Sequence, residues 1–383
     1  MRIVRRAERP QESGLRVAVA FHDGTPNGAV LSVLRAVPHL EERGWKFSFW
    51  LPHPSPLFDH LAAEGRVVDG AERHLEGYSL RALRHPPGLR VRARAIRAYL
   101  AGFRRFLADQ RAALVHANSL FTFAEACVGR AGRYPTVLHI HEIMPGNWKT
   151  PAVKAAIALA RINPVAVSRA SAEPLRGFGL RPAIVHESAP VPDQPSRPRP
   201  ACRRLVVGSV GVISRRKGSD VFVEAARRVL EQTDAVTFQL VGTYPDTPEA
   251  PWAAAVLESA RRVGIEHTPA ADVYALLREW DVFVLASRID PFPLVVLEAM
   301  ACSVPVIGAA TDGISEQVTP ETGLLVPPDD PGALAESILR LIRMPARQRW
   351  AMGCAARLRV EQNFTPEAQA ERLHATYLSA LSA

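Results

Sequence analysis

Short apolar runs alternate with helix-forming stretches along most of the chain. Five such runs occur in the first half, at 15–21, 46–51, 113–117, 136–141 and 163–168. A second series follows at 204–210, 235–242, 281–287, 304–310 and 323–328. Strands that alternate with helices form parallel sheets, because each helix carries the chain back across the sheet to the start of the next strand. The sequence therefore predicts an α/β fold with two parallel sheets.

A proline-rich segment separates the two series. Between 181 and 201, prolines stand at positions 182, 190, 192, 195, 198 and 200. At this density proline excludes both a helix and a central strand, because it lacks a backbone N–H and restricts φ. A chain of 383 residues is long enough for two domains. We predict a first domain over 1–190, a linker over 191–203, a second domain over 204–364 and a final helix over 365–383.

Composition limits the class of protein. The chain is 48% hydrophobic and 22% charged, which is typical of a soluble globular protein, and it has no uncharged apolar run of membrane-spanning length. Its basic N-terminal residues precede no signal-peptide core, so we expect a cytoplasmic protein. The four cysteines are scattered and form no paired motif, which argues against a zinc site or a disulfide framework.

Much of the net charge of +9 comes from arginine, and one stretch is especially basic. Residues 81–111 hold nine arginines and a single acid, Asp109. The apolar residues there fall on one helical face, which predicts a surface helix packed on its own domain with a solvated basic side. The alternative is a docking surface for an anionic membrane, with the protein peripheral to the inner face. No nucleic-acid-binding module is visible, so we expect no nucleic-acid partner.

Two carboxylates, Asp290 and Glu298, bracket seven residues within the stretch 281–316. The stretch predicts a strand, a proline-bearing loop, a helix, a second strand and a second loop. Free N–H groups at the start of that helix, near Leu294 to Val296, favour an anion. A nucleotide sugar suits this arrangement, because the carboxylates can accept hydrogen bonds from sugar hydroxyls and the helix start can bind phosphate. The alternative is that Asp290 only caps the loop before the helix.

A second anion site is predicted where GVISRRKG, residues 211–218, opens another helix. Arg215, Arg216 and Lys217 supply positive charge at this turn. A diphosphate leaving group needs such charge as its bond breaks. The alternative is a solvated basic turn without a ligand.

In the first half, Asn27 and Gly28 stand in a turn between a strand and a helix, where glycine lets the backbone approach a ligand. Such a turn serves equally for chain reversal. His139 and His141 alternate onto one face of a later strand, with Glu142 adjacent. Together they could bind a metal. The sequence places no third ligand, so we expect them to line a cleft and to bond neighbouring loops.

The motifs of the second half resemble those of a known family. The run DPFPLVVLEAMA from Asp290, with PVIG at 305–308 and GISE at 313–316, is similar to the E-x7-E segment of the retaining GT-B glycosyltransferases, above all family 4. The likeness extends through TGLLVPPD at 322–329 and back to GVISRRKG, while the first half matches weakly. It implies two Rossmann-like domains that face each other across a cleft, with the final helix packing back toward the first domain.

The resemblance also implies roles for single residues. Asp290 would contact hydroxyls of the donor sugar, Glu298 the ribose, and Lys217 the diphosphate, which makes Asp290 and Lys217 catalytic candidates. Asp290 stands where the family has glutamate, so its reach is shorter by about 1.5 Å, one carbon–carbon bond. The resemblance therefore leaves the preferred sugar open.

An arginine that the family often has directly after the first glycine of the basic turn is replaced here by Val212. We expect Arg215 to take the catalytic role of that arginine, with Arg216 among the donor-binding residues. The other expected donor-binding residues are Gly28, Gly211, Phe292, Pro293, Leu294 and Val295.

On the acceptor side, the family frequently has a histidine facing the cleft at the position of His116, which becomes a catalytic candidate. Further acceptor-side candidates are Asn27, His141 and Glu142. The chain contains no D-x-D motif, the metal–diphosphate signature of the other large glycosyltransferase fold. We therefore expect no metal and no cofactor.

These observations predict a retaining glycosyltransferase, of the hexosyltransferase class. It would move a sugar from a nucleoside-diphosphate sugar to an unidentified sugar, lipid or small-molecule acceptor. Attack would occur on the same face, with the departing phosphate helping to deprotonate the acceptor. One alternative is a GT-B relative that couples an activated non-sugar or hydrolyses its donor. The other is a non-catalytic protein that binds a nucleotide sugar or an anionic surface.

Overall fold

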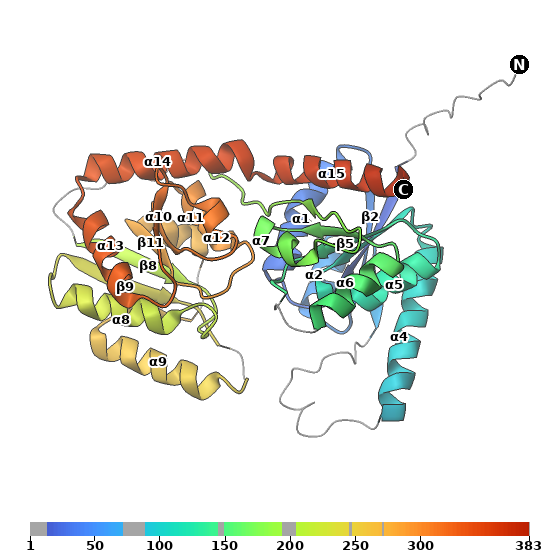
Figure 1. Ribbon diagram of the computed structural model, residues 1–383, viewed down its shortest axis with the longest axis horizontal. Helices are drawn as coiled ribbons and strands as arrows, with labels where there is room; N and C mark the ends of the chain where they lie inside the picture. The colour runs from blue at the N-terminus through green and yellow to red at the C-terminus, as the bar shows by residue number, and fades with distance from the viewer. Residues whose placement is uncertain are drawn as a thin grey trace, which may run out of the picture.

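The computed structural model describes residues 14–71, 89–144, 149–193, 204–244, 247–269 and 272–382 of the chain. Within these residues the chain forms two halves, each built on one parallel sheet with helices on its faces (Figure 1). The first sheet has the strand order β3-β2-β1-β4-β5-β6-β7, and the second has the order β10-β9-β8-β11-β12-β13. This arrangement of two Rossmann-like sheets confirms the predicted fold class. The predicted linker, 191–203, lies outside the described residues from position 194 onward.

The elements of the first half follow the expected alternation of strand and helix. Its strands are β1 (Arg16–Phe21), β2 (Lys46–Pro52), β3 (Val68–Ala71), β4 (Leu114–Asn118), β5 (Thr136–Ile140), β6 (Asn163–Ala166) and β7 (Ala183–Ile184). Its helices are α1 (Gly28–Glu41), α2 (Pro56–Ala63), α4 (Leu89–Asp109), α5 (Phe123–Ala131), α6 (Lys149–Leu159) and α7 (Arg169–Ala172), with short 3-10 turns at Leu120–Thr122 and Glu173–Leu175.

The second half repeats this alternation and ends in three successive helices. Its strands are β8 (Leu205–Val210), β9 (Val236–Val241), β10 (Glu266–Thr268), β11 (Val282–Leu285), β12 (Val306–Ala309) and β13 (Gly323–Val326). Its helices are α8 (Ser219–Leu230), α9 (Ala250–Val263), α10 (Val273–Glu279), α11 (Leu294–Ala301), α12 (Ile314–Gln317), α13 (Pro331–Arg343), α14 (Ala346–Asn363) and α15 (Pro366–Ser382).

The last two helices connect the halves. In Figure 1, α14 and α15 lie along one edge of the molecule, α14 over the second half and α15 over the first. Val360 of α14 belongs to the apolar core of the second half, whereas Leu373 and Tyr377 of α15 are fully buried in the core of the first. Because α15 buries its apolar residues in a core formed by the other end of the chain, the two halves are held face to face.

Helix α4 packs on one face of the first sheet. It buries Tyr99, Phe103 and Phe106 around Trp50 of β2. The arginines of α4 whose side chains the structure describes, Arg94, Arg97, Arg104 and Arg105, are exposed. Such a helix is packed on its own domain and solvated on its basic side, as expected from the sequence; residues 81–88 of the basic stretch lie outside the described residues. Across the described part of the chain, no helix has both the length and the apolar character needed to cross a membrane.

Candidate functional site

A cavity of about 790 Å³ lies between the halves and is lined by both. From the first half, the sequence-predicted residues that line it are Asn27, Gly28, His141 and Glu142. From the second half they are Gly211, Arg216, Lys217, Asp290, Phe292, Pro293, Leu294, Val295 and Glu298. The carboxyl ends of parallel strands commonly form ligand sites, because the loops and helix starts gather there. The structure therefore brings most of the predicted residues to one place.

Two helix starts face this cavity. Helix α1 begins at Gly28 and is capped by Asn27, whose Oδ1 accepts from Val30 N at 3.1 Å. Helix α11 begins at Leu294 after Pro293, and no side chain caps it. Asp290 is therefore not its cap. A Cβ on Gly28 would lie 3.7 Å from Leu294, so the two helix starts approach closely. Helix starts carry partial positive charge, which makes this part of the cavity suited to an anion.

Beside α11, the basic turn meets the acidic loop in a buried ion pair. Lys217 Nζ lies 2.6 Å from Asp290 Oδ2, which also accepts from Ser287 Oγ at 3.0 Å. Asp290 is only 4% exposed. Arg216 extends along the same wall, where NH1 donates to the carbonyl of Ile289 at 3.1 Å. The pair fixes the ammonium group at the cavity wall and satisfies one oxygen of the carboxylate.

Arg215 lies elsewhere. Its guanidinium stacks over the ring of Trp252, on α9, at 4.8 Å from the ring centroid, and it does not line the cavity. Neighbouring residues of a turn point in different directions, and Trp252 offers a favourable aromatic surface on the outer side. The structure therefore brings Arg216 to this cavity, and not Arg215 as expected.

His116 also lies away from the cavity. It is fully buried in the middle of β4, where Nδ1 lies 2.6 Å from the hydroxyl of Tyr377 on α15. The expectation that His116 faces the cleft is thus not met, because α15 covers this part of the strand. The residue at the end of β4 is Asn118, and its side chain does reach the cavity wall, where it contacts His141.

Two buried histidines, His116 and His139, predict that the folded protein loses stability at acidic pH. Burial lowers the pKa of His116 to about 3, from 6.5 when exposed, and lowers the pKa of His139 as well. Below pH 6.5 the unfolded chain binds a proton that folded His116 does not bind. Folding stability therefore falls as the pH drops from 6.5 toward 3. His116 should contribute a slope of about 1.4 kcal/mol per pH unit, and His139 a slope of the same sign.

Urea denaturation at steps between about pH 4 and pH 6 measures this slope. His116→Gln should reduce it by about one proton. A matched control is His60→Gln, which also removes one imidazole but from a side chain that is 64% exposed, so it should not reproduce the effect of His116→Gln. Equal slopes for the wild type and His116→Gln would contradict the burial argument.

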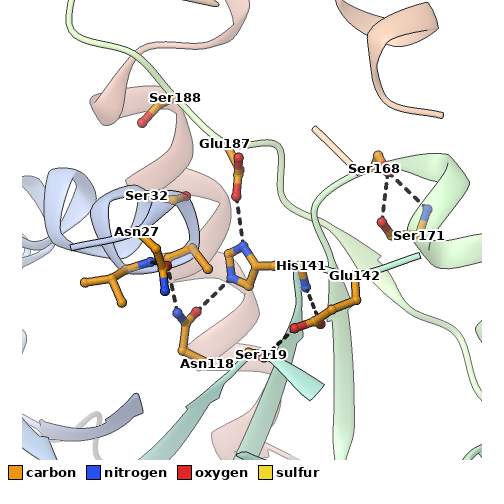
Figure 2. A network of polar contacts seen from close by, with 12 residues as sticks. Asn27, Ser32, Asn118, Ser119, His141, Glu142, Ser168, Ser171, Glu187 and Ser188 are labelled. Atoms are coloured by element: carbon orange, nitrogen blue, oxygen red, sulfur yellow. Dashed lines mark hydrogen bonds and ion pairs between the residues drawn. The ribbon is translucent and has the colours of Figure 1, made fainter. Parts of the chain in front are cut away.

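His141 has a hydrogen-bond partner at each ring nitrogen (Figure 2). Nδ1 lies 2.8 Å from Glu187 Oε1, and Nε2 lies 2.8 Å from Asn118 Oδ1. The Asn118 amide is oriented by its own Nδ2, which donates to the carbonyl of Ala29 at 2.9 Å. With the amide oriented in this way, Nε2 carries a proton and donates it to Asn118. Neither ring nitrogen has a lone pair directed at the cavity.

The carboxylate of Glu142 is likewise occupied by hydrogen bonds within the first half. Its Oε2 accepts from the backbone N–H of Leu120 at 3.1 Å and of His141 at 3.0 Å, and its Oε1 accepts from Ser119 Oγ (Figure 2). Ser119 has a φ of 93°, which is unfavourable for a residue with a side chain. These bonds fix the loop after β4. Among the residues that the structure describes, no histidines, cysteines and acids gather into a group that could hold a metal.

Two charged residues of this site, Glu187 and Arg35, were not foreseen. Glu187 follows β7 in the proline-rich region and lines the cavity beside His141, and burial raises the pKa of its carboxyl. Arg35, on α1, forms an ion pair with Glu298, NH2 to Oε1, at 2.6 Å. No local motif marks either residue, because each acquires its partner only through the tertiary fold.

Family models match both halves of the chain. Residues 26–187 match Glycosyltransferase Family 4, and residues 204–344 match Glycosyl transferases group 1. The second match contains the basic turn, Asp290 and Glu298. The first contains α1 and the His141 network.

Curated relatives match over part of their length. The chain is 33% identical over 168 residues to a GDP-mannose-dependent monoacylated alpha-(1-6)-phosphatidylinositol monomannoside mannosyltransferase of Corynebacterium glutamicum, which covers 41% of this chain and 43% of the relative. It is 36% identical over 176 residues to an alpha-maltose-1-phosphate synthase of Mycolicibacterium smegmatis, which covers 42% and 44%. The matches thus span less than half of these relatives.

Solved structures match over nearly the whole chain. The HepE protein of Anabaena, in complex with UDP and glucose, has a TM-score of 0.77 at 19% identity, covering 95% of this chain and all of that one. Sucrose-phosphate synthase from Thermosynechococcus elongatus has a TM-score of 0.74 at 20% identity, covering 96% and 99%. These likenesses show a common fold. The two family models, which together match most of the chain, establish that it belongs to glycosyltransferase family 4, the glycosyl transferases group 1, and the solved structures show that it has the GT-B fold.

Proposed function

We propose that this chain is a retaining hexosyltransferase that moves a sugar from a nucleoside-diphosphate sugar to an acceptor held against the first half. The observation that carries the proposal is the cavity in which Lys217, paired with Asp290, lies close to the start of α11. Cations and free backbone N–H groups are the partners that a diphosphate requires. An acidic wall beside them suits the hydroxyls of a sugar.

On the donor side, Lys217, Arg216 and the start of α11 bind the diphosphate and stabilise the charge that develops as it leaves. Glu298 accepts from the ribose hydroxyls. Asp290 accepts a hydrogen bond from Lys217 through one carboxylate oxygen. The carboxylate also accepts a hydrogen bond from a hydroxyl of the transferred sugar. Both roles of Asp290 depend on its ionised form.

The engaged side chains of the first half support a mechanism without a protein base. Both nitrogens of His141 are engaged by hydrogen-bond partners, and Glu142 accepts from two backbone N–H groups and a hydroxyl. In the proposed step the bond from the anomeric carbon to the phosphate oxygen breaks, and a bond to the acceptor oxygen forms on the same face. The acceptor proton passes to the departing phosphate. Members of family 4 are retaining, which agrees with this step.

A donor screen followed by product analysis tests the proposal. Because one relative is named as GDP-mannose-dependent and one structural neighbour contains UDP-glucose, the panel includes both nucleotide sugars and their free nucleotides. A donor at about one hundred times its Kd stabilises the fold by about 2.7 kcal/mol, which should raise the melting temperature by several degrees. NMR of the product should then show the anomeric configuration of the donor.

An inverted anomer would contradict the retaining mechanism. Release of free sugar at the same rate with and without acceptor would instead favour the alternative of donor hydrolysis. Binding without turnover across a broad acceptor panel would favour a non-catalytic nucleotide-sugar binder.

A further inference from the structure

Arg35 joins the two halves at the donor side of the cavity. It belongs to α1 of the first half, yet its NH2 lies 2.6 Å from Glu298 Oε1 on α11 of the second half. The side chains of Arg35 and Glu298 are 19% and 11% exposed. An ion pair so shielded from water is stronger than a surface pair, provided that its remaining polar atoms are also bonded.

The other side of the guanidinium is bonded as well. NH1 of Arg35 donates to the carbonyl of Ser188 at 3.1 Å, in the segment that leaves the first half. Ser188 Oγ donates to Gln369 Oε1 of α15 at 2.6 Å, and Gln369 Nε2 donates to Ser32 Oγ of α1 at 2.8 Å. Helices α1, α11 and α15 and the connecting segment therefore meet around one guanidinium. This network fixes the direction of Arg35 without a contribution from Glu298.

We propose that Arg35 is a positioning residue for the donor: it keeps the Glu298 carboxylate correctly oriented for the ribose, and does so only while the two halves are closed on each other. This inference rests on the proposed function, because it takes Glu298 as the ribose acceptor. A carboxylate has two oxygens and about four lone-pair directions. Glu298 can thus keep Arg35 on Oε1 and accept from ribose hydroxyls through Oε2.

The ion pair couples closure of the cavity to binding of the nucleotide, two events that would otherwise be independent. Opening of the cavity separates Arg35 from Glu298 and leaves a buried carboxylate without its cation, which is unfavourable. A bound ribose adds bonds to the oriented carboxylate and so favours the closed form. By linkage, a change that weakens closure must weaken nucleotide binding by the corresponding factor.

Arg35→Met tests this coupling, because methionine keeps much of the apolar stem and removes the charge. Isothermal titration with UDP and with GDP should show that the better-bound nucleotide binds about tenfold or more weakly to the variant, the effect of losing a charge-assisted hydrogen bond. Arg35→Lys should restore part of the affinity. The matched control is Arg43→Met, on an exposed arginine just past α1 that bonds the carbonyl of His39 at 2.6 Å; its affinity should equal that of the wild type.

Two further measurements separate positioning from a general loss of structure. In a Glu298→Gln background, Arg35→Met should cause little additional loss of nucleotide affinity, since both changes act through one carboxylate. Small-angle X-ray scattering of the unliganded protein should give a larger radius of gyration for Arg35→Met than for the wild type or Arg43→Met. Unchanged affinity, fully additive losses or an unchanged radius would each overturn the proposal. If the wild type binds neither nucleotide, the proposed function fails, and the scattering comparison still decides whether Arg35 holds the halves closed.

Discussion

Lys217→Ala is expected to lower turnover by about a hundredfold or more, the effect of removing one donor from a developing anion. The Lys217 side chain is only 14% exposed and its ammonium group contacts Asp290 at the cavity wall. Its charge is therefore weakly screened by water and already oriented before the donor binds. The measurement is the steady-state rate with the donor that the nucleotide screen identifies, and near-normal turnover would refute the role.

Loss of the ion pair must be separated from loss of catalysis. Lys217→Ala leaves Asp290 buried without a cation, so it should also reduce stability. Adding Asp290→Asn to Lys217→Ala removes the unpaired charge and should recover stability without recovering turnover. Lys154→Ala is the control for loss of a lysine, because Lys154 lies on α6 beside Phe178, away from the cavity lining. Recovery of turnover in the double variant would assign Lys217 a structural role only.

The central strands could be predicted because their signal is local. All ten apolar runs form strands in the structure, since a parallel strand covered on both faces is apolar along its length, as the fully buried Val17–Phe21 shows. The sequence gives no such signal for β3, β7 and β10. These three strands lie at sheet edges, and β10 is exposed throughout. An edge strand can form without an apolar run, because it is less buried than a central strand and is held by its backbone hydrogen bonds to the neighbouring strand.

The residues of the candidate site also divide into those that local sequence patterns predict and those that depend on the tertiary fold. Lys217, Asp290 and Gly28 line the cavity because they occupy turns directly after strands or at helix starts, positions that sequence patterns reveal. Local sequence does not determine the direction of a side chain within a turn. Arg215, for example, packs over the ring of Trp252, thirty-seven positions further along the chain. Partners from distant segments are harder still. Arg35 and Glu298 stand 263 positions apart, and nothing near either residue indicates the other.

Gly218→Ala is expected to reduce both stability and turnover. Gly218 ends the basic turn and precedes α8 with φ 66° and ψ 32°, a left-handed conformation that costs other residues about 1 to 2 kcal/mol. A Cβ there would also lie 1.9 Å from the carbonyl oxygen of Ala286, and a backbone atom cannot rotate away as a side chain would. We expect the free energy of unfolding to fall by about 3 kcal/mol or more. Relief of the overlap must move the turn, and with it the adjacent Lys217 and Arg216.

Gly264→Ala supplies the matched comparison, because it isolates the backbone cost. Gly264 ends α9 with φ 86°, and a Cβ there meets no atom within 4 Å. Its replacement should lower the free energy of unfolding by only about 1 to 2 kcal/mol and leave turnover unchanged. Urea denaturation and steady-state rates on the two variants measure the difference. If Gly218→Ala were no less stable than Gly264→Ala and equally active, the close approach of the basic turn to the end of β11 would not be what positions Lys217.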